Sequence, residues 1–453
     1  MSFLKTYRIP LLFSLLCAIM YASFAYDLIR SDFAKLISLY AALFFISYKL
    51  IQTNKNHFWL LAGLGLVFRF VFMGAIPNLS QDFYRFLWDG RLMVAGINPY
   101  LITPETYLES GNLIVPQAQE LYQGMGALNG SHYSNYPPIN QLCFAIAGLV
   151  SGKSILGSVI VLRLLIILAD IGILYFGKKL LEKLRLPTYR IFWYFLNPFI
   201  IIELTGNLHF ESVMLFFLVA SLYLLHEKKW FWSAVLLGAS VSVKLIPLLF
   251  LPLFFQWFVK KESLWSGFIS LTKFYFVVLL TVVLSFAPFL SSEFVINFSK
   301  TISLWFQNFE FNASIYYIIR WIGFKTIGWN IIEDVGKILP LIVVAFLMIM
   351  SFFRKNKSTT QLIPAMLLCI SFYFLLSTTV HPWYVATPLA LSIFTRYRFP
   401  IIWSFTVILS YAAYNSDVFS ENLWLVGIEY VVVIGFFIWE LQKKPNPMVK
   451  KTI

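Results

Sequence analysis

The stretch ILGSVIVLRLLIILADIGILYFGK, from Ile155 to Lys178, carries few charges and is long enough to cross a bilayer as one α-helix, which takes roughly 17–25 apolar residues. Similar apolar runs recur through most of the chain, which is 59% hydrophobic and only 12% charged. A soluble protein of this length needs far more polar surface. The runs are also too long and continuous for barrel strands. The sequence therefore predicts an all-α, polytopic transmembrane protein that forms a single integral membrane domain over residues 1–453.

The basic residues indicate how the predicted helices are oriented. The formal net charge is +14, but the cations lie in short clusters between apolar runs, for example at residues 178–190 and 354–357. This pattern is typical of cytoplasmic loops, so it indicates topology and not nucleic-acid binding. We expect both termini, Lys183 and Lys260 on the cytoplasmic side, with Asn112 and Gln307 outside. About twelve to fourteen spans are predicted, near residues 9–27, 33–51, 58–76, 155–178, 189–204, 209–225, 230–243, 246–259, 267–289, 336–353, 361–378, 383–395, 399–414 and 424–441.

Two predicted extracytoplasmic loops are long, at residues 77–154 and 290–335. Each contains an apolar segment too short for a full span, Pro138 to Val150 in the first and Ser314 to Gly323 in the second. As a span, Pro138 to Val150 would place the basic residues 178–190 outside, so we predict interfacial or re-entrant helices. Long loops in a compact protein are usually functional or disordered, and the many aromatic residues here argue against disorder.

The first long loop begins with LSQDFYRFLWDGRLMVAGINPY, from Leu79 to Tyr100. As a helix it places Asp82, Arg85 and Asp89 on one face, at positions i, i+3 and i+7. We expect an amphipathic helix at the outer interface that shows its carboxylates inward. Its apolar residues, Phe83, Phe86, Leu87 and Met93, are then expected against lipid. The alternative is an ordinary surface helix that carries an Asp–Arg pair.

Further polar residues collect at the same predicted membrane face. Ionisable residues at membrane depth are costly, so their default interpretation is functional. Three alternatives remain for single residues: a structural role for a histidine at a helix end, Lys244 reaching a lipid headgroup, and Trp383 with Tyr384 anchoring the interface. The residues in this group are Tyr136, Asn207, His209, Glu211, Lys244, Gln307, Asn308, Asn312, His381, Trp383 and Tyr384.

The chemistry of these residues favours a base acting beside an anion. Asp82 and Asp89 are candidate general bases, while Arg85, Lys244, Arg320 and protonated histidines are candidate anion binders. Phosphate loops, Cys/His metal motifs, nucleophile elbows and dinucleotide fingerprints do not occur in the sequence. A substrate with a phosphate head and an apolar tail fits this combination.

The first-loop pattern resembles a known family. Gln81-Asp82-Phe-Tyr84-Arg85-Phe-Leu-Trp88-Asp89-Gly90, followed by Gly96-Ile-Asn98-Pro99-Tyr100 and Tyr136-Pro137-Pro138, is similar to the first outer loop of GT-C glycosyltransferases. The likeness points to polyprenyl-phosphate-mannose-dependent mannosyltransferases, which include the catalytic subunit of GPI mannosyltransferase I and bacterial relatives. It extends over roughly residues 75–440. Its supporting pieces are Gly206-Asn-Leu-His209-Phe-Glu211, Val243-Lys244-Leu-Ile-Pro247 and His381-Pro382-Trp383-Tyr384.

The resemblance implies a GT-C-like fold and transfer of a hexose, chiefly mannose, from a polyprenyl-phosphate donor to a lipid-linked or glycan acceptor. The transfer is expected at the outer face, with inversion and with Asp82 as base. Relatives often show Asp-x-Asp, whereas this chain has Ser80-Gln81-Asp82. That departure weakens the case for a divalent cation such as Mg²⁺ or Mn²⁺, for which no ligands are predicted, and it leaves Asp89 as a rival base.

In this hypothesis Arg85 pairs with Asp89 or meets the donor phosphate, and Lys244 with Arg320 neutralises the leaving phosphate. The expected partners are the donor, the acceptor, membrane lipids and a possible partner subunit, but not nucleic acid. The expected location is a plasma or inner membrane in bacteria and the endoplasmic reticulum in eukaryotes. The remaining predicted substrate-binding residues are Tyr100, Tyr136, His209, Glu211, Asn312, His381 and Tyr384.

Three other functions stay open at this point. A secondary transporter or lipid flippase usually places ionisable residues near the bilayer midplane, whereas here they gather at one face. A non-catalytic subunit of a glycan assembly complex and an outer-face polymerase or ligase of lipid-linked glycans are the others. Sugar transfer from a lipid carrier distinguishes an enzyme from a transporter.

Overall fold

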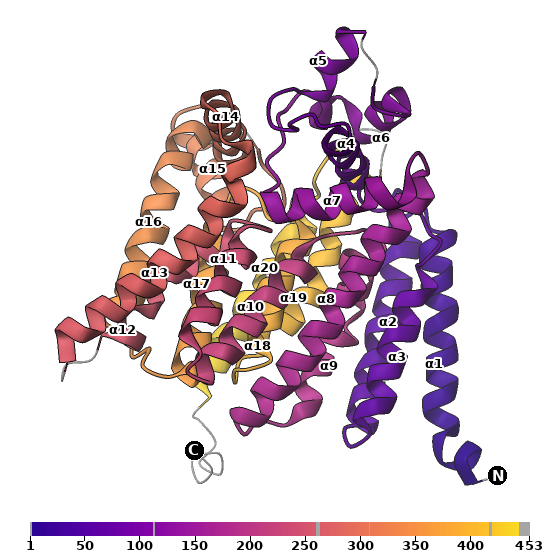
Figure 1. Cartoon of the computed structure of the whole chain (residues 1–453). Helices are drawn as coiled ribbons and strands as arrows, with labels where there is room; N and C mark the ends of the chain where they lie inside the picture. Colours follow the sequence, from indigo (N-terminus) through magenta and orange to yellow (C-terminus); the bar gives the residue numbers. More distant parts are fainter. Residues whose placement is uncertain (1, 112–113, 260–262, 308, 416–418, 444–453) are drawn as a thin grey trace.

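The computed structural model describes residues 2–111, 114–259, 263–307, 309–415 and 419–443, and in these ranges the chain is helical (Figure 1). The one β feature among them is an isolated parallel bridge between Phe311 and Thr379. Asn112, Asn308 and Lys260 lie outside the described residues. Helices of the 3-10 and π types are labelled η.

The helices, in chain order, are α1 (Ser2–Tyr26), α2 (Phe33–Thr53), α3 (Phe58–Val71), α4 (Asp82–Val94), α5 (Pro104–Glu109), α6 (Ala118–Gly130), α7 (Pro138–Ser151), α8 (Ile155–Lys183), η1 (Thr188–Ile191), α9 (Phe192–Phe195), η2 (Ile200–Gly206), α10 (Glu211–His226), α11 (Trp230–Val241), η3 (Ile246–Phe254), α12 (Phe255–Phe258), α13 (Leu264–Phe286), η5 (Ala287–Phe289), α14 (Ser292–Gln307), α15 (Ile315–Thr326), α16 (Ile332–Phe352), α17 (Thr359–Leu376), η6 (Pro382–Val385), α18 (Ala386–Ser392), α19 (Phe399–Thr406), η7 (Val407–Tyr414) and α20 (Leu423–Gln442).

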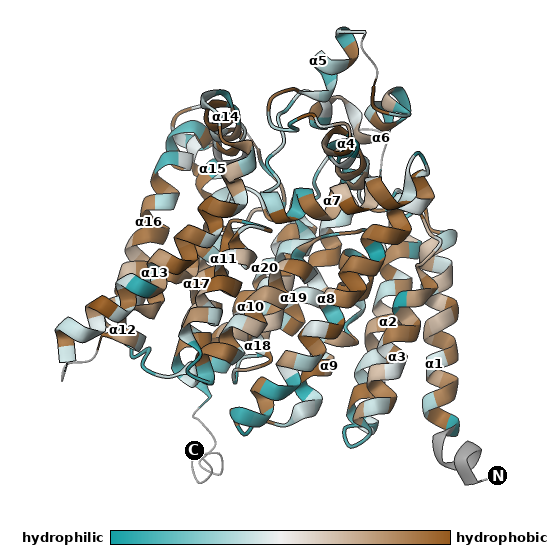
Figure 2. Ribbon diagram, in the orientation of Figure 1, coloured by the Kyte–Doolittle hydropathy of each residue, from teal (hydrophilic) through white to brown (hydrophobic). Residues whose placement is uncertain are grey.

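The polytopic helical architecture predicted from the sequence is confirmed. Seven helices of the described chain are long and apolar enough to cross a membrane, or eight if the bent pair η2–α10 counts as one span. Five further apolar helices are shorter. Helices lie where the spans were predicted, but several are broken, so the larger count of twelve to fourteen spans stays a prediction. Figure 2 shows the hydrophobic residues along the upright helices and many hydrophilic ones in the loops at their ends.

The two long loops fold at the same end of the molecule. Helices α4, α5 and α6 of the first loop and α14 of the second lie at the end opposite the N-terminus (Figure 1). Helix α7, which covers the segment predicted to be interfacial, runs across the ends of the upright helices in that view. The backbone amide of Ile139, at the start of α7, donates to the carbonyl of Ser242, 2.9 Å away, and so fixes this loop to the end of α11.

Helix α4 packs into the protein, which corrects one expectation. Phe83, Phe86 and Leu87 were expected against lipid, yet all three are buried, because α6 and α7 cover the helix. The close approach of α4 to α7 depends on Gly90. A Cβ atom at this position would lie only 2.2 Å from the carbonyl oxygen of Phe144.

The bend between η2 and α10 carries buried polar residues. The two helices meet at 112°, and the segment between them includes Leu208 at φ 62°. Arg163 of α8 donates to the freed carbonyls of Thr205 and Gly206, each at 2.9 Å. Buried backbone groups at a break need such partners, so Arg163 stabilises the bend that carries His209 and Glu211.

Candidate active site

A cavity of about 890 Å³ opens beneath the first long loop. Its walls come from the α1–α2 loop, α4, the segment before α7, the η2–α10 bend, η3 and the segments around α17, η6 and η7. Small-molecule sites typically measure about 300–1,000 Å³. Six of the predicted site residues line it, namely Asp82, Tyr136, His209, Lys244, His381 and Tyr384.

Asp82 is the first residue of α4 and faces the cavity. It is partly buried, and its carboxylate accepts a long hydrogen bond, 3.5 Å, from Nδ2 of Asn129. Its position is fixed from the preceding residues, because the amide of Leu79 donates to Oδ1 of Asn207 at 2.9 Å and Gln81 Nε2 donates to the carbonyl of Met125 at 2.9 Å.

The electrostatic environment suits Asp82 to the role of a base. Burial raises the pKa of the Asp82 carboxyl above its usual range, while Lys244, the hydrogen bond from Asn129 and Arg30 act in the opposite direction. A desolvated carboxylate with a raised pKa accepts a proton more readily once it is ionised.

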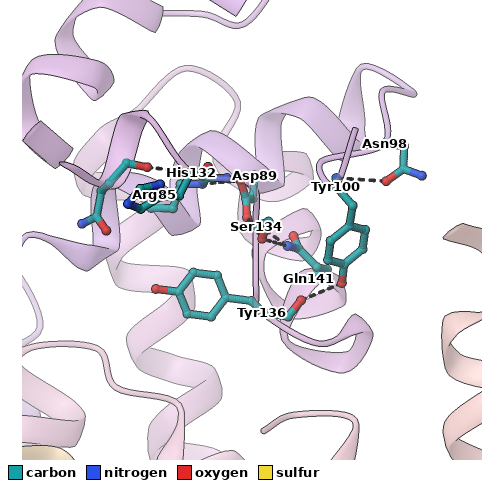
Figure 3. A network of polar contacts seen from close by, with 9 residues as sticks. Arg85, Asp89, Asn98, Tyr100, His132, Ser134, Tyr136 and Gln141 are labelled. Carbon is teal, nitrogen blue, oxygen red and sulfur yellow. Dashed lines mark hydrogen bonds and ion pairs between the residues drawn. The ribbon is translucent and has the colours of Figure 1, made fainter. Parts of the chain in front are cut away.

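Asp89 lies away from the cavity, in a closed polar network (Figure 3). The side chain is fully buried. Its carboxylate accepts from Arg85 Nε at 2.8 Å, from the Ser134 hydroxyl at 2.5 Å and from Gln141 Nε2 at 2.9 Å. Arg85 also donates to the carbonyls of Asn129 and His132, both at 2.8 Å. The pair therefore supports the loop that presents Asn129 to Asp82.

Lys244 and Glu211 form an ion pair at the base of the cavity. Lys244 lies in the turn after α11 and Glu211 begins α10, so the η2–α10 bend and the α11–η3 break meet here. Glu211 is fully buried, while Lys244 is partly exposed to the cavity. The lysine therefore faces the space where a substrate would bind, with its charge balanced by its partner.

Three aromatic rings of the cavity lining stack on one another. The His209 ring stacks on Trp383 at 3.6 Å between centroids, and Trp383 stacks on His381 at 4.6 Å. Tyr384 is partly buried in the cavity wall, against Phe374. Because Trp383 lines the cavity and stacks with two histidines, it lies in the wall of the site and not in the position of a lipid-facing anchor.

Three further residues predicted for the site lie outside the lining of this cavity, and the structure places each in a supporting contact. The Tyr100 hydroxyl donates to the Tyr136 carbonyl at 2.6 Å, as Figure 3 shows. Asn312 is buried against α20, where its carbonyl accepts from the Tyr430 hydroxyl at 2.6 Å. Arg320 forms an ion pair with Glu310, which itself lines the cavity. Their role in binding substrate stays a prediction.

Several lining residues were not identified from the sequence. They include Arg30, Asn129, Asn140, Glu310 and Tyr411. Arg30 lies in the short loop between α1 and α2. The charge pattern of the sequence gives no reason to assign a function to a single cation in such a loop. Tyr411 donates to both oxygens of Glu203, at 2.9 and 3.1 Å, a contact that joins residues more than two hundred positions apart.

A divalent cation finds a poor set of ligands here. Among the described residues, groups of three or more His, Cys, Asp or Glu side chains that could hold a metal ion are absent. The carboxylate of Asp82, which lines the cavity, accepts its side-chain hydrogen bond from the amide of Asn129. We therefore assign no step of the chemistry to a metal.

The fold and the cavity together define a polytopic membrane protein with a carboxylate site beneath an extramembrane loop. Residues 37–260 match the family described as "Alpha-(1->6)-mannopyranosyltransferase, N-terminal domain". A curated relative, "Alpha-(1->6)-mannopyranosyltransferase B" of Corynebacterium glutamicum, is 26% identical over 149 residues, which are 33% of this chain. The match covers 24% of that relative, about a quarter of its length.

These likenesses confirm the resemblance to mannosyltransferases that was inferred from the first-loop motif. They also agree with an integral, multi-pass membrane location. The matched region includes Asp82, His209, Glu211 and Lys244 but ends before His381 and Tyr384. The C-terminal wall of the cavity is therefore described by the structure alone.

Proposed function

We propose that the protein is a membrane mannosyltransferase that moves mannose from a polyprenyl-phosphate donor to a lipid-linked or glycan acceptor on the extracytoplasmic face. The observation that carries the proposal is Asp82, a carboxylate without an ion-pair partner among the described residues, which faces a large cavity. The likeness to mannosyltransferases supports the identity of the sugar.

The proposed reaction is a single displacement at the anomeric carbon. The acceptor hydroxyl oxygen attacks this carbon, and the bond from the carbon to the donor phosphate breaks, with the electron pair leaving on the phosphate oxygen. Asp82 accepts the acceptor's proton as the new glycosidic bond forms. The products are the mannosylated acceptor and polyprenyl phosphate, and the anomeric configuration is inverted.

The walls of the cavity suit a donor that is polar at one end and apolar at the other. Polar residues such as Asp82, Asn129 and Lys244 contribute to one part of the lining, and η3 contributes Ile246, Leu248 and Leu249. A second, smaller cavity of about 90 Å³ shares Tyr373 and Tyr384 with the first. Its lining combines apolar residues of α16 and α17, such as Leu339, Val343 and Leu376, with the hydroxyl residues at 377–379. These surfaces support an isoprenoid tail lying between helices, with the sugar and phosphate above it.

The proposal is tested with purified protein, polyprenyl-phosphate [¹⁴C]mannose and a cell lipid extract as the source of acceptors. We expect labelled mannose to appear on an acceptor and Asp82→Asn to abolish most of this transfer while the protein stays folded. Movement of the intact donor across proteoliposomes without any sugar transfer would support a transporter and refute the enzyme. Transfer of a larger glycan instead of one mannose would indicate a polymerase or ligase.

A further inference from the structure

The charged side chains that line the cavity are Arg30, Asp82, Lys244 and Glu310. Two of them are already neutralised, because Lys244 pairs with Glu211 and Glu310 pairs with Arg320. The other two have no ion-pair partner among the described residues. The cavity therefore presents one carboxylate, from Asp82, and one cation, from Arg30, and neither charge is engaged in a direct ion pair within the described chain.

Arg30 lies in the short loop between α1 and α2, and the acidic residues of this loop are occupied elsewhere. Asp27 pairs with Lys35 at 2.6 Å. Asp32 caps α2 by accepting from the backbone amide of Lys35 at 3.0 Å. Neither carboxylate contacts the guanidinium of Arg30, which leaves this loop free to direct a positive charge into the cavity.

The guanidinium is held in place by an aromatic ring. Its Cζ atom lies 3.1 Å from the centroid of the Tyr414 ring, at the end of η7. The Nε atom is buried without a hydrogen-bond partner among the described residues. The contact of Arg30 with the cavity therefore comes from the rest of its side chain and not from Nε.

We propose that Arg30 is the principal binding residue for the phosphate of the substrate, held by Tyr414, while Lys244 has a secondary role because Glu211 balances its charge. This inference rests on the proposed function. Arginine suits the task because its planar fork donates two parallel hydrogen bonds to a phosphate and stacks on an aromatic ring at the same time. The positive charge of Arg30 also interacts with the Asp82 carboxylate and lowers its pKa.

The test measures binding and not catalysis. Purified full-length protein is titrated with farnesyl phosphate, with farnesol and with inorganic phosphate in the same detergent. We expect the wild-type protein to prefer farnesyl phosphate over farnesol, and Arg30→Gln to weaken farnesyl phosphate binding about 10- to 100-fold with little change for farnesol. Inorganic phosphate that competes equally well would assign the site to the free anion.

Two companion variants make the assignment specific. Arg30→Lys keeps the charge but loses the fork, so it should restore only part of the affinity. Tyr414→Leu removes the supporting ring and should weaken binding, whereas Tyr414→Phe keeps it and should not. Arg396→Gln is the matched control, because Arg396 lies 5.1 Å from the Tyr397 ring but is exposed and does not line the cavity.

The outcomes separate this inference from the proposed function. Unchanged farnesyl phosphate binding in Arg30→Gln, or a larger loss in Lys244→Gln than in Arg30→Gln, would overturn the assignment of Arg30 even if mannose transfer is observed. A phosphate preference that depends on Arg30, in a protein that transfers no mannose, would keep the site and overturn the proposed enzyme. A wild-type protein that binds farnesyl phosphate and farnesol equally would also overturn the assignment.

Discussion

Replacing Asp82 by asparagine keeps the shape of the side chain and removes its ability to accept a proton. If Asp82 is the base, the rate of mannose transfer should fall by roughly 10²–10⁴, the usual contribution of general base catalysis. This corresponds to about 3–5 kcal/mol of transition-state stabilisation. The contacts of Asp82 are weak, since the hydrogen bond from Asn129 to its side chain is 3.5 Å long and it has no ion-pair partner among the described residues.

For that reason the same substitution should leave the fold nearly unchanged. Burial already disfavours the charged form of Asp82, so a neutral asparagine should change the free energy of unfolding by about 1 kcal/mol or less. Asp89→Asn is the informative comparison. Asp89 is fully buried and accepts three hydrogen bonds, one of them from Arg85. Removing its charge leaves a buried guanidinium uncompensated, which typically costs about 3–5 kcal/mol.

Both variants are measured by transfer from polyprenyl-phosphate mannose and by thermal unfolding in detergent. We expect Asp82→Asn to lose activity at an unchanged Tm, and Asp89→Asn to lower the Tm and to lose activity by a smaller factor once the folded fraction is taken into account. A large loss at Asp89 with near-normal activity at Asp82 would refute the assignment of the base. Normal activity in both single variants and in the double variant would refute a catalytic role for this loop.

The remaining predictions test the environment of the base, the helix packing and the topology. Because burial raises the pKa of Asp82 and a base acts only when ionised, activity should fall as the pH drops through this raised pKa. Asn129→Ala removes a contact that lowers the pKa, so it should move the acidic side of the pH–activity profile to higher pH. An unchanged profile would count against Asp82 as the titrating group. Gly90→Ala should lower the Tm strongly, because the new methyl group would lie 2.2 Å from the carbonyl oxygen of Phe144. The expected cost is about 1–3 kcal/mol or more. Gly63→Ala is the control and should be neutral or stabilising, because a Cβ atom there has nothing within 4 Å. Cysteines placed at Ser131 and Lys183 should react with an impermeant reagent from opposite sides of the membrane. The background should be low, because the native Cys17, Cys143 and Cys369 are buried. Labelling of both positions from the same side would refute the predicted orientation.

The helices themselves could be predicted from the sequence because their signal is local. Apolar runs mark the spans, and the run at 155–178 lies within α8. Breaks were partly visible as well, since the segment around Lys244 and Pro247 separates α11 from η3. The environment of α4 was predicted incorrectly, because its apolar face packs against α6 and α7, and periodicity alone does not distinguish lipid from protein as the apolar neighbour.

The sequence by itself determined that this chain spans a membrane many times and carries a carboxylate motif like that of the mannosyltransferases, because both features are written in contiguous residues. It did not distinguish Asp82 from Asp89, which are seven positions apart on one helix. Only the tertiary structure placed Asp82 in the cavity and Asp89 in a closed network, and only it brought Arg30 and Tyr414 into contact. These differences arise from packing between distant segments, which decides whether a charge finds a partner or faces an open space.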